Sequence, residues 1–274
     1  MDSRINDQLS LFEASNVWTD VRNTSQKQAA QVQAYFGCAG WSIPKQAVEL
    51  FPLVGTHLQR YASVLRGVEI NSSFYRPHRK NTYARWAESV PPDFRFAVKF
   101  PKEVTHDNRL TDPNGRVTVF LEECSGLGHK LGPLLVQLPP SLPFMASIAE
   151  TFFARLRDRH NGHIVCEPRH PSWFEPDAMA LLQSFGIARV GADPSVVPDA
   201  FTPVAASGVI YIRLHGSPVM YVSDYQETFL SNLAAQVVQW QTSNQVWVMF
   251  DNTSVGAAWY NAVNVQSKTV AAVP

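Results

Sequence analysis

The chain has 274 residues, of which 45% are hydrophobic, which is enough for one large barrel-type domain or for two ordinary domains. Its 23 Lys and Arg residues balance its 23 Asp and Glu residues, so the net charge gives no global signal for nucleic acid or a membrane surface. The three cysteines form no C-x-x-C pair, and no apolar run approaches the roughly 20 residues of a membrane helix. We therefore expect a cytoplasmic protein with reduced thiols and no membrane contact.

Residues 1–32 are rich in Asn, Gln, Ser and Thr and are predicted to form a flexible leader. Within it, the segment QLSLF resembles the short peptide by which many bacterial replication and repair proteins dock on the sliding clamp. The resemblance implies that Gln8, Leu9, Leu11 and Phe12 bind a preformed apolar groove of such a clamp. The alternative is that the apolar residues fold back and cap the N-terminal end of the domain that follows.

From Gln33 onward, short β-rich runs alternate with segments of helical apolar spacing. Eight strands are predicted, in the runs AYFGCAG, GVEINSSF, FRFAVKF, PLLVQLP, HIVCEP, IARVGAD, VIYIRLHG and VWVMFDN. Eight strand-then-helix units over this length favour an α/β fold of the closed (β/α)8 TIM-barrel type over an open doubly wound sheet. No G-x-G-x-x-G fingerprint follows the first strand, which argues against a dinucleotide-binding sheet. We assign residues 33–265 to a single barrel domain and residues 266–274 to a short tail.

Polar residues fall at the C-terminal ends of the predicted strands. Because side chains alternate along a strand, Tyr211, Arg213 and His215 share one face of VIYIRLHG, and we assign that face to the barrel interior. The same count selects, at the ends of other strands, Glu69 with Asn71, Ala97 with Lys99, Glu167 with Arg169, and Met249 with Asp251, while Asp193 ends the sixth strand. Catalytic residues of TIM barrels come from these strand ends. The alternative is that the charges pair with one another and fill a polar barrel mouth.

Seven segments resemble, in order and spacing, the motifs of the YecE-like family, also catalogued as domain of unknown function 72. They are GCAGWS, VEINSSFYR, RFAVKFPKEVTHDNRL, LGPLLVQLPPSL, EPRHPSWF, YIRLHG and FDNTSVGAAWYNA. The resemblance covers roughly residues 35–263 and implies a TIM barrel, in agreement with the strand count, but it implies little chemistry. The chain departs from the family pattern at Cys38, Ile43 and Pro168, and Pro168 ends a ladder beside Arg169.

The mixture of acids, cations and histidines at the predicted mouth suits an anionic substrate. We predict acid/base catalysis by Glu69, Glu167, Asp193, His215 and Asp251. We predict substrate binding by Asn71, Tyr75, Lys99, His106, Arg169, Arg213, Asn252 and Thr253, with Lys99 and Arg213 clamping a phosphate or carboxylate. Thr253 or Ser254 is placed to cap the helix after the eighth strand, where TIM barrels commonly bind phosphate, and plain capping is an equal alternative.

No cofactor and no resident metal are predicted, because no two acidic or imidazole side chains share a diagnostic metal-ligand spacing. The leading hypothesis is an enzyme that acts on a phosphate-bearing substrate in nucleic-acid metabolism. Basic loop residues such as Arg76, Arg79, Lys102 and Arg109 leave direct contact with nucleic acid open, although neighbouring acids dilute the patch. Two alternatives remain: a non-catalytic adaptor that binds a ligand or nucleic acid, and a metabolic hydrolase or isomerase, with or without a metal, on a small phosphorylated or carboxylated molecule.

Overall fold

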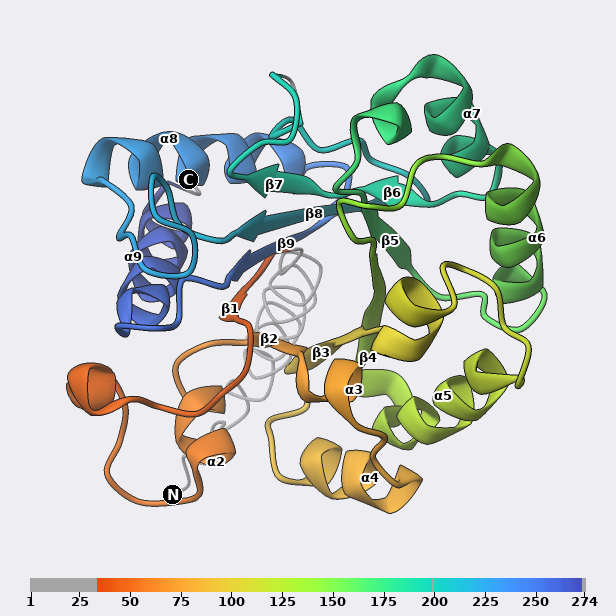
Figure 1. Cartoon of the computed structure of the whole chain (residues 1–274). Coiled ribbons are helices and arrows are strands. Elements are labelled where there is room, and N and C mark those ends of the chain that lie inside the picture. Colours follow the sequence, from red (N-terminus) through yellow and green to blue (C-terminus); the bar gives the residue numbers. More distant parts are fainter. Residues whose placement is uncertain (1–33, 199, 273–274) are drawn as a thin grey trace, which may run out of the picture. The chain divides into compact units, whose positions relative to one another are not determined.

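The computed structural model describes residues 34–198 and 200–272, which form a barrel of parallel strands surrounded by helices (Figure 1). The strands are β1 (Ala34–Cys38), β2 (Gly67–Ile70), β3 (Arg95–Lys99), β4 (Leu131–Gln137), β5 (Ile164–Glu167), β6 (Ala188–Arg189), β7 (Gly191–Asp193), β8 (Val209–Leu214) and β9 (Gln245–Phe250). Every ladder between them is parallel. Each strand overlaps a run that the sequence predicts to be a strand, and the predicted α/β barrel fold is confirmed. The leader, including QLSLF, lies outside the described residues.

Two ladders make up the barrel wall, with strand orders β1-β9-β8-β7 and β2-β3-β4-β5-β6. The segments β6 and β7 act as one strand interrupted at Val190, because β6 pairs with β5 while β7 pairs with β8. The ladders meet again between β1 and β2, where a single bridge joins Ala39 to Glu69. Counting β6 and β7 together, the described residues therefore form the eight-stranded wall of a TIM barrel.

Tyr61 reinforces the seam between β1 and β2. Its buried hydroxyl accepts a hydrogen bond from the Cys38 amide at 2.8 Å and donates one to the Gly67 carbonyl at 2.9 Å. Glycine allows the strands to approach this closely, because a Cβ atom at Gly37 would lie 2.0 Å from the Gly67 carbonyl oxygen. A side-chain hydroxyl thus links the backbones of β1 and β2 by hydrogen bonds, whereas backbone ladders link neighbouring strands elsewhere in the wall.

Helices connect the strands and cover their outer faces. The α-helices are α2 (His57–Ala62), α3 (Ser72–Tyr75), α4 (Lys80–Glu88), α5 (Arg116–Cys124), α6 (Ala146–Arg157), α7 (Pro176–Ser184), α8 (Glu227–Trp240) and α9 (Ala257–Ala271). Shorter turns are η1 (Lys45–Leu50), η3 (Ser125–Lys130) and η4 (Pro171–Phe174), all 3-10, and the π-helical turn η2 (Glu103–Asp107). Within the described ranges, none of these helices combines the length and apolar character needed to cross a bilayer.

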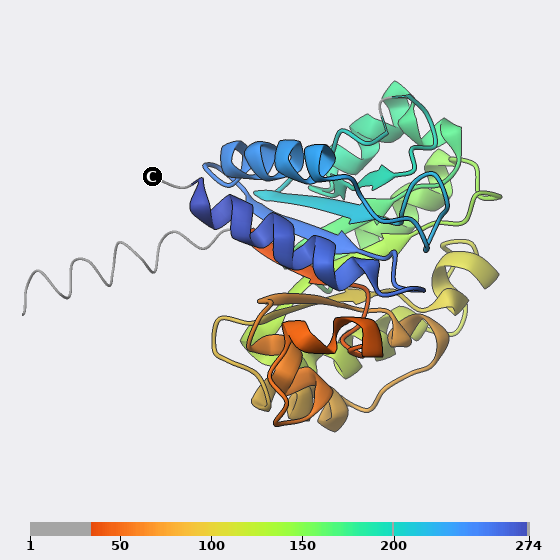
Figure 2. The same ribbon diagram turned by 90° about the vertical axis from the view of Figure 1, so that its left-hand side faces the viewer.

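Helix α9 corrects the predicted boundary of the barrel domain. It packs beside α8 and against β1 and β9 (Figure 2) and continues to Ala271. Gln266 donates a hydrogen bond to the Val64 carbonyl at 2.8 Å, and Thr269 is buried. Residues 266–271 therefore belong to the barrel domain and not to a tail. The sequence missed this because their composition is polar and small, while the helix is held by its neighbours.

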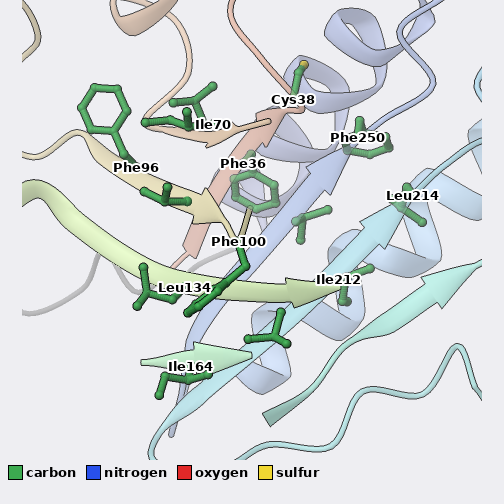
Figure 3. Close-up of a cluster of buried hydrophobic side chains, with 14 of the residues drawn as sticks. Phe36, Cys38, Ile70, Phe96, Phe100, Leu134, Ile164, Ile212, Leu214 and Phe250 are labelled. Atoms are coloured by element: carbon green, nitrogen blue, oxygen red, sulfur yellow. The ribbon is translucent and has the colours of Figure 1, made fainter. Parts of the chain in front are cut away.

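Strand alternation divides the buried apolar side chains into two clusters. The outer cluster, between strands and helices, includes Phe36, Ile212, Leu214 and Phe250 (Figure 3). The inner cluster fills the barrel lumen and includes Tyr35, Ala97, Leu135, Val165, Tyr211, Trp247 and Met249. Ile212 and Leu214 face outward while Tyr211 faces inward, so the predicted facing of VIYIRLHG is confirmed. Apolar and aromatic side chains therefore fill the lumen, and charged side chains lie at its end, where the strands have their carboxyl ends.

Candidate functional site

A cluster of charged side chains, the mouth cluster, closes the carboxyl end of the lumen. Its members are Glu69 from β2, Lys99 from β3, Glu167 and Arg169 at the end of β5, Arg213 and His215 at the end of β8, and Asp251 after β9. Four of them, Glu69, Glu167, Arg213 and His215, are almost completely buried. The structure thus brings together residues that the sequence selects by strand alternation. Their predicted roles stay predictions.

Arg213 is the centre of the mouth cluster. Its Nε and Nη2 atoms donate to the two oxygens of Glu69 at 3.0 and 2.7 Å. Its Nη1 donates to Glu167 at 2.5 Å, and Nη2 also reaches Asp251 at 3.0 Å. Each nitrogen of the guanidinium therefore already contacts a carboxylate. The geometry does not support the expectation that Arg213 clamps a substrate anion; it holds three carboxylates in place.

Tyr211 also contacts the mouth cluster, although it is not among the predicted site residues. Its buried hydroxyl donates to Glu69 at 2.8 Å. Tyr211 is the inward-facing residue of β8 that precedes Arg213. Together, Tyr211 and Arg213 occupy both oxygens of Glu69. Both oxygens of Glu69 therefore already accept hydrogen bonds, and its predicted role in acid/base catalysis stays a prediction. The strand alternation that selects Arg213 also places Tyr211 inward, so alternation alone could have identified Tyr211.

His215 links the two other carboxylates of the cluster. Its Nδ1 lies 3.1 Å from Asp251, and its Nε2 lies 3.1 Å from Glu167 and 2.8 Å from Nη2 of Arg169. A guanidinium only donates, so when the imidazole is neutral Nε2 accepts from Arg169 and Nδ1–H donates to Asp251. When it is protonated, both nitrogens donate to the carboxylates. The ring has partners in either state, which is what a proton relay requires.

Close pairing shifts the pKa values of Glu167, Asp251 and Arg213 toward the charged forms. Burial alone raises the pKa of Glu167, but Arg213 and then Arg169 hold it well below its usual range. For Asp251, burial again opposes, and Arg213 and the hydrogen bond from His215 lower the pKa. Burial opposes the charge of Arg213 too, yet Glu167 and Glu69 raise its pKa well above the usual value. These three groups are therefore ionised at neutral pH.

Lys99 is the exception in the mouth cluster. The residue is 9% exposed, none of the hydrogen bonds and ion pairs between described residues involves its ammonium, and Nζ is not one of the fully buried polar atoms that lack a partner. The Nζ atom instead lies 4.2 Å from the centroid of the Phe74 ring. Burial, and next the nearby charge of Arg213, lowers its pKa to about 8, although the three carboxylates of the cluster partly offset this. Lys99 is therefore a desolvated amine that stays available.

The remaining predicted binding residues on this side of the barrel are His106, Asn71 and Tyr75. The ring of His106 packs edge-on to Phe74, with centroids 4.9 Å apart, and burial, then Lys99, lowers the pKa of His106. Asn71 is half-buried, and its side-chain oxygen has no hydrogen-bond partner among the described residues. Tyr75 is 80% exposed and points away from the buried cluster.

Three predicted site residues lie apart from the mouth cluster. Asp193 accepts a hydrogen bond from the Tyr225 hydroxyl at 2.7 Å and lines a small separate pocket beside the loop after β8. Asn252 is fully buried and donates to the Ser223 carbonyl and to Asn261, as a structural residue would. Thr253 is half-buried and bonds through its carbonyl to the Gly256 amide. The expectation that Thr253 or Ser254 caps the next helix is wrong, because Gly256 is the N-cap of α9 and no side chain caps it.

Tyr221 is a second residue that the sequence did not reveal. Its backbone has a φ of +67°, an uncommon left-handed conformation for a tyrosine, and its amide donates to the carbonyl of His215. Its half-exposed ring packs edge-on to the His215 imidazole with centroids 5.9 Å apart. The loop after β8 therefore places an aromatic ring against the His215 imidazole. No period or motif in SPVMYVS predicts this position.

Lys102 and Arg109, two of the four basic loop residues named above, and the neighbouring Lys80 are engaged with their own surroundings. Lys80 pairs with Glu122 at 2.8 Å, Lys102 pairs with Asp107 at 2.7 Å, and Arg109 donates to the Ser141 carbonyl at 2.6 Å. Such exposed pairs leave little uncompensated positive charge for a phosphate polymer. A groove between α5 and α6 contains no member of the mouth cluster.

The described residues contain no group of three or more His, Cys, Asp or Glu side chains arranged to hold a metal ion. The metal alternative draws on Glu69, Glu167, Asp193, His215 and Asp251, of which Asp193 lies apart. The three cysteines are free and buried.

The fold and the mouth cluster define a TIM-barrel protein with a charged site at the carboxyl ends of its strands. The chain belongs to the family described as "Protein of unknown function DUF72", whose model matches residues 35–273. It is 33% identical over 141 residues to the UPF0759 protein YecE of Escherichia coli (strain K12), a match that covers 51% of this chain and 50% of that protein. The chain thus spans about half the length of the YecE relatives it matches. It is 24% identical to the UPF0759 protein YunF of Bacillus subtilis (strain 168), covering 82% and 90% of the two chains.

Two solved structures share the fold. A DUF72 family protein from Thermotoga maritima is 26% identical, with a TM-score of 0.72 over 85% of this chain and 98% of that one. Another from Enterococcus faecalis is 21% identical, with a TM-score of 0.74 over 86% and 95%. The family resemblance read from the seven motifs is therefore confirmed.

Proposed function

We propose that the protein is an enzyme that binds a small anionic substrate at the barrel mouth and performs acid/base chemistry on it. The observation that supports this most directly is the state of Lys99. The Lys99 side chain is largely buried and its charge senses three carboxylates, yet its ammonium pairs with no described residue, whereas Arg213 is fully engaged. A buried charge without a partner is costly, and such groups concentrate at functional sites.

The remaining groups divide into two roles. Lys99 and Arg169 are the cations that a substrate carboxylate or phosphate would meet, because each keeps a small exposed area at the mouth. His215 moves protons between substrate and the carboxylates of Glu167 and Asp251, which it contacts through its two nitrogens. We place phosphate-bearing molecules first among the anions, because the QLSLF segment links the chain to DNA metabolism.

Calorimetric titration with inorganic phosphate and with adenosine monophosphate near pH 7 tests the anion site. We expect wild-type protein to bind and both Lys99→Met and Arg169→Met to weaken binding at least about tenfold, or ~1.4 kcal/mol. Lys80→Met is the matched control, because this exposed lysine pairs with Glu122 away from the mouth and should leave affinity unchanged. Equal affinity in all four proteins, or no binding by the wild type, would reject the site.

The internal pairing of Arg213 favours one second candidate, a non-catalytic ligand-binding adaptor whose charged residues mainly stabilise the barrel. Incubation with phosphorylated aldehydes and ketones in D2O separates the two. An enzyme with a working relay incorporates deuterium next to the carbonyl or converts the compound, and His215→Asn loses that activity. An adaptor binds the same compounds without changing them.

We also propose that residues Gln8–Phe12 attach the protein to a bacterial sliding clamp. Support comes from the sequence alone, in which one polar and three large apolar residues match a peptide that docks in an apolar groove. Attachment would bring the barrel to DNA and its fragments without requiring a strong nucleic-acid surface on the barrel itself.

A further inference from the structure

We infer that Lys99 is a nucleophile that forms an imine with the carbonyl carbon of an anionic aldehyde or ketone. The inference rests on the proposed anion site and names its substrate class. Lys99 ends β3 on the inward face, two positions after Ala97 of the lumen cluster. Its amine therefore shares the mouth with Glu167, Arg213 and Asp251, whose charges act on it.

A second buried lysine shows what a structural lysine looks like in this protein. Lys130 is 7% exposed, and its Nζ atom donates to the carbonyls of Ala87 and Val90, both at 2.6 Å. Lys99 is about equally buried but has no such acceptor among the described residues. The Lys130 ammonium is satisfied by the protein itself, whereas Nζ of Lys99 has no protein acceptor and is not fully enclosed, so it is open to a substrate at the mouth.

The surroundings of Lys99 favour that neutral form. Phe74 covers the amine at 4.2 Å, and burial followed by the charge of Arg213 lowers its pKa to about 8. About a tenth of the amines are then unprotonated at pH 7, a few hundredfold more than for an ordinary lysine. Desolvation and a neighbouring cation are the two means by which proteins activate a lysine for imine formation. The π-helical turn η2 begins four residues later, a rare form that often accompanies functional sites.

The reaction balances without an oxidant or cofactor. The Nζ lone pair attacks the carbonyl carbon, a C–N bond forms, and the carbonyl oxygen takes a proton to give a carbinolamine. Nitrogen then loses a proton, the hydroxyl takes a proton and leaves as water, and the nitrogen lone pair forms the C=N bond, so that amine, carbonyl and one proton yield a protonated imine and one water. We assign the proton transfers to His215, between Glu167 and Asp251, and to His106, beside Phe74. Arg169 would hold the anionic group of the substrate.

Reductive trapping tests the inference on the full chain. Glyoxylate and pyruvate, an anionic aldehyde and an anionic ketone, are incubated with the protein and cyanoborohydride near pH 7. Hydride reduces the imine to a stable secondary amine, and peptide mass mapping locates it. We expect Lys99 to be labelled at least about tenfold faster than the exposed Lys80 and Lys102, and Lys130 to remain unlabelled. Lys99→Met and Lys99→Arg should remove the fast label, and circular dichroism verifies that both fold.

The outcomes separate the imine from the anion site. A uniform label over the exposed lysines, or a fast label that survives in Lys99→Met, rejects the imine. If Lys99→Met also weakens phosphate binding as described above, the anion site stands and only the covalent step falls. If Lys99 is not labelled faster than the exposed lysines and Lys99→Met also binds phosphate as tightly as the wild type, both the imine and the anion site are rejected. Fast labelling at Lys99 that excess phosphate slows supports the two together.

Discussion

Arg213 and Glu69 form a two-pronged ion pair inside the barrel, with Nε 3.0 Å from one carboxylate oxygen and Nη2 2.7 Å from the other. Both side chains are almost completely buried. The same guanidinium neutralises Glu167 and Asp251, so three strands besides β8 depend on one cation. Arg213 therefore acts on stability first, and on chemistry only through the groups it positions.

Replacing Arg213 by Met should destabilise the fold by about 3–5 kcal/mol, because it leaves buried carboxylates without their counter-charge. Urea unfolding at pH 7 measures the change. Arg169→Met is the comparison, and it should cost clearly less because Glu167 keeps Arg213. A loss below about 1 kcal/mol for Arg213→Met would contradict the central role assigned to this residue.

Stability should fall in acid through Glu167 and Asp251. Their pKa values lie below the ordinary 4.5 and 3.8 in the folded state, so the unfolded chain binds protons first as the pH drops. Their contribution is complete above about pH 5 and is lost progressively as the pH falls toward the native pKa values. Urea unfolding between pH 6 and pH 3 measures this loss. Glu167→Gln should flatten the slope; an unchanged slope would assign the acid sensitivity to other carboxylates.

Lys99→Met should stabilise the protein at neutral pH by on the order of 1–3 kcal/mol. The native pKa of Lys99 is lowered to about 8, so the folded state carries the full cost of the ammonium below that pH. That cost fades as the pH rises toward the ordinary value of 10.5. The groups that set this balance are Arg213, Glu69, Glu167, Asp251 and, on the loop after β3, His106. Urea unfolding at pH 7 and near pH 10 should show the advantage shrink; a destabilised variant at pH 7 would mean that Lys99 stabilises the cluster.

A peptide of residues 1–16 should bind a bacterial sliding clamp at about micromolar affinity, because a short groove contact must offset the ordering of the peptide. Leu11→Ala combined with Phe12→Ala should abolish binding, as fluorescence anisotropy would show. In the full chain, the double substitution should leave the melting temperature nearly unchanged. A loss of several kcal/mol there would instead place these side chains against the barrel.

The sequence predicts the barrel well because strand alternation and strand ends are local properties. The inward facing of Tyr211 and Arg213 follows from counting along one strand. What Arg213 does with its donors does not follow, because Glu69, Glu167 and Asp251 reach it from three other strands and compete for the same nitrogens. The sequence therefore predicts the charge of Arg213 and the face of β8 on which it lies, but not its partners.

Other differences have equally specific causes. Asn252 follows Asp251 directly, so alternation itself points it to the opposite side of the wall, where it bonds Asn261. Asp193 follows the interruption at Val190, and its carboxylate turns to Tyr225. The position of Tyr221 over His215 depends on a left-handed backbone in a loop, which residue type alone does not indicate.

Tyr61→Phe tests the seam between β1 and β2. The hydroxyl bonds both the Cys38 amide and the Gly67 carbonyl, so its removal leaves two buried backbone groups unsatisfied. We expect a loss of about 2–4 kcal/mol in urea unfolding, against about 1 kcal/mol or less for Ser89→Ala, whose hydroxyl donates to a helix carbonyl near the surface. Equal effects of the two substitutions would mean that the seam is held by packing alone.

Because one phenol and one bridge hold this seam, the barrel has a built-in place to open. Separating β1 from β2 breaks no continuous ladder, so the wall can unroll there while the remaining strands keep their pairing. The Cys38 amide, which is bonded to a side chain rather than to a neighbouring strand, exchanges with solvent hydrogen whenever that happens. The hydrogen-exchange rate of this amide therefore measures how often β1, which carries Cys38, separates from β2, which carries Glu69 of the mouth cluster.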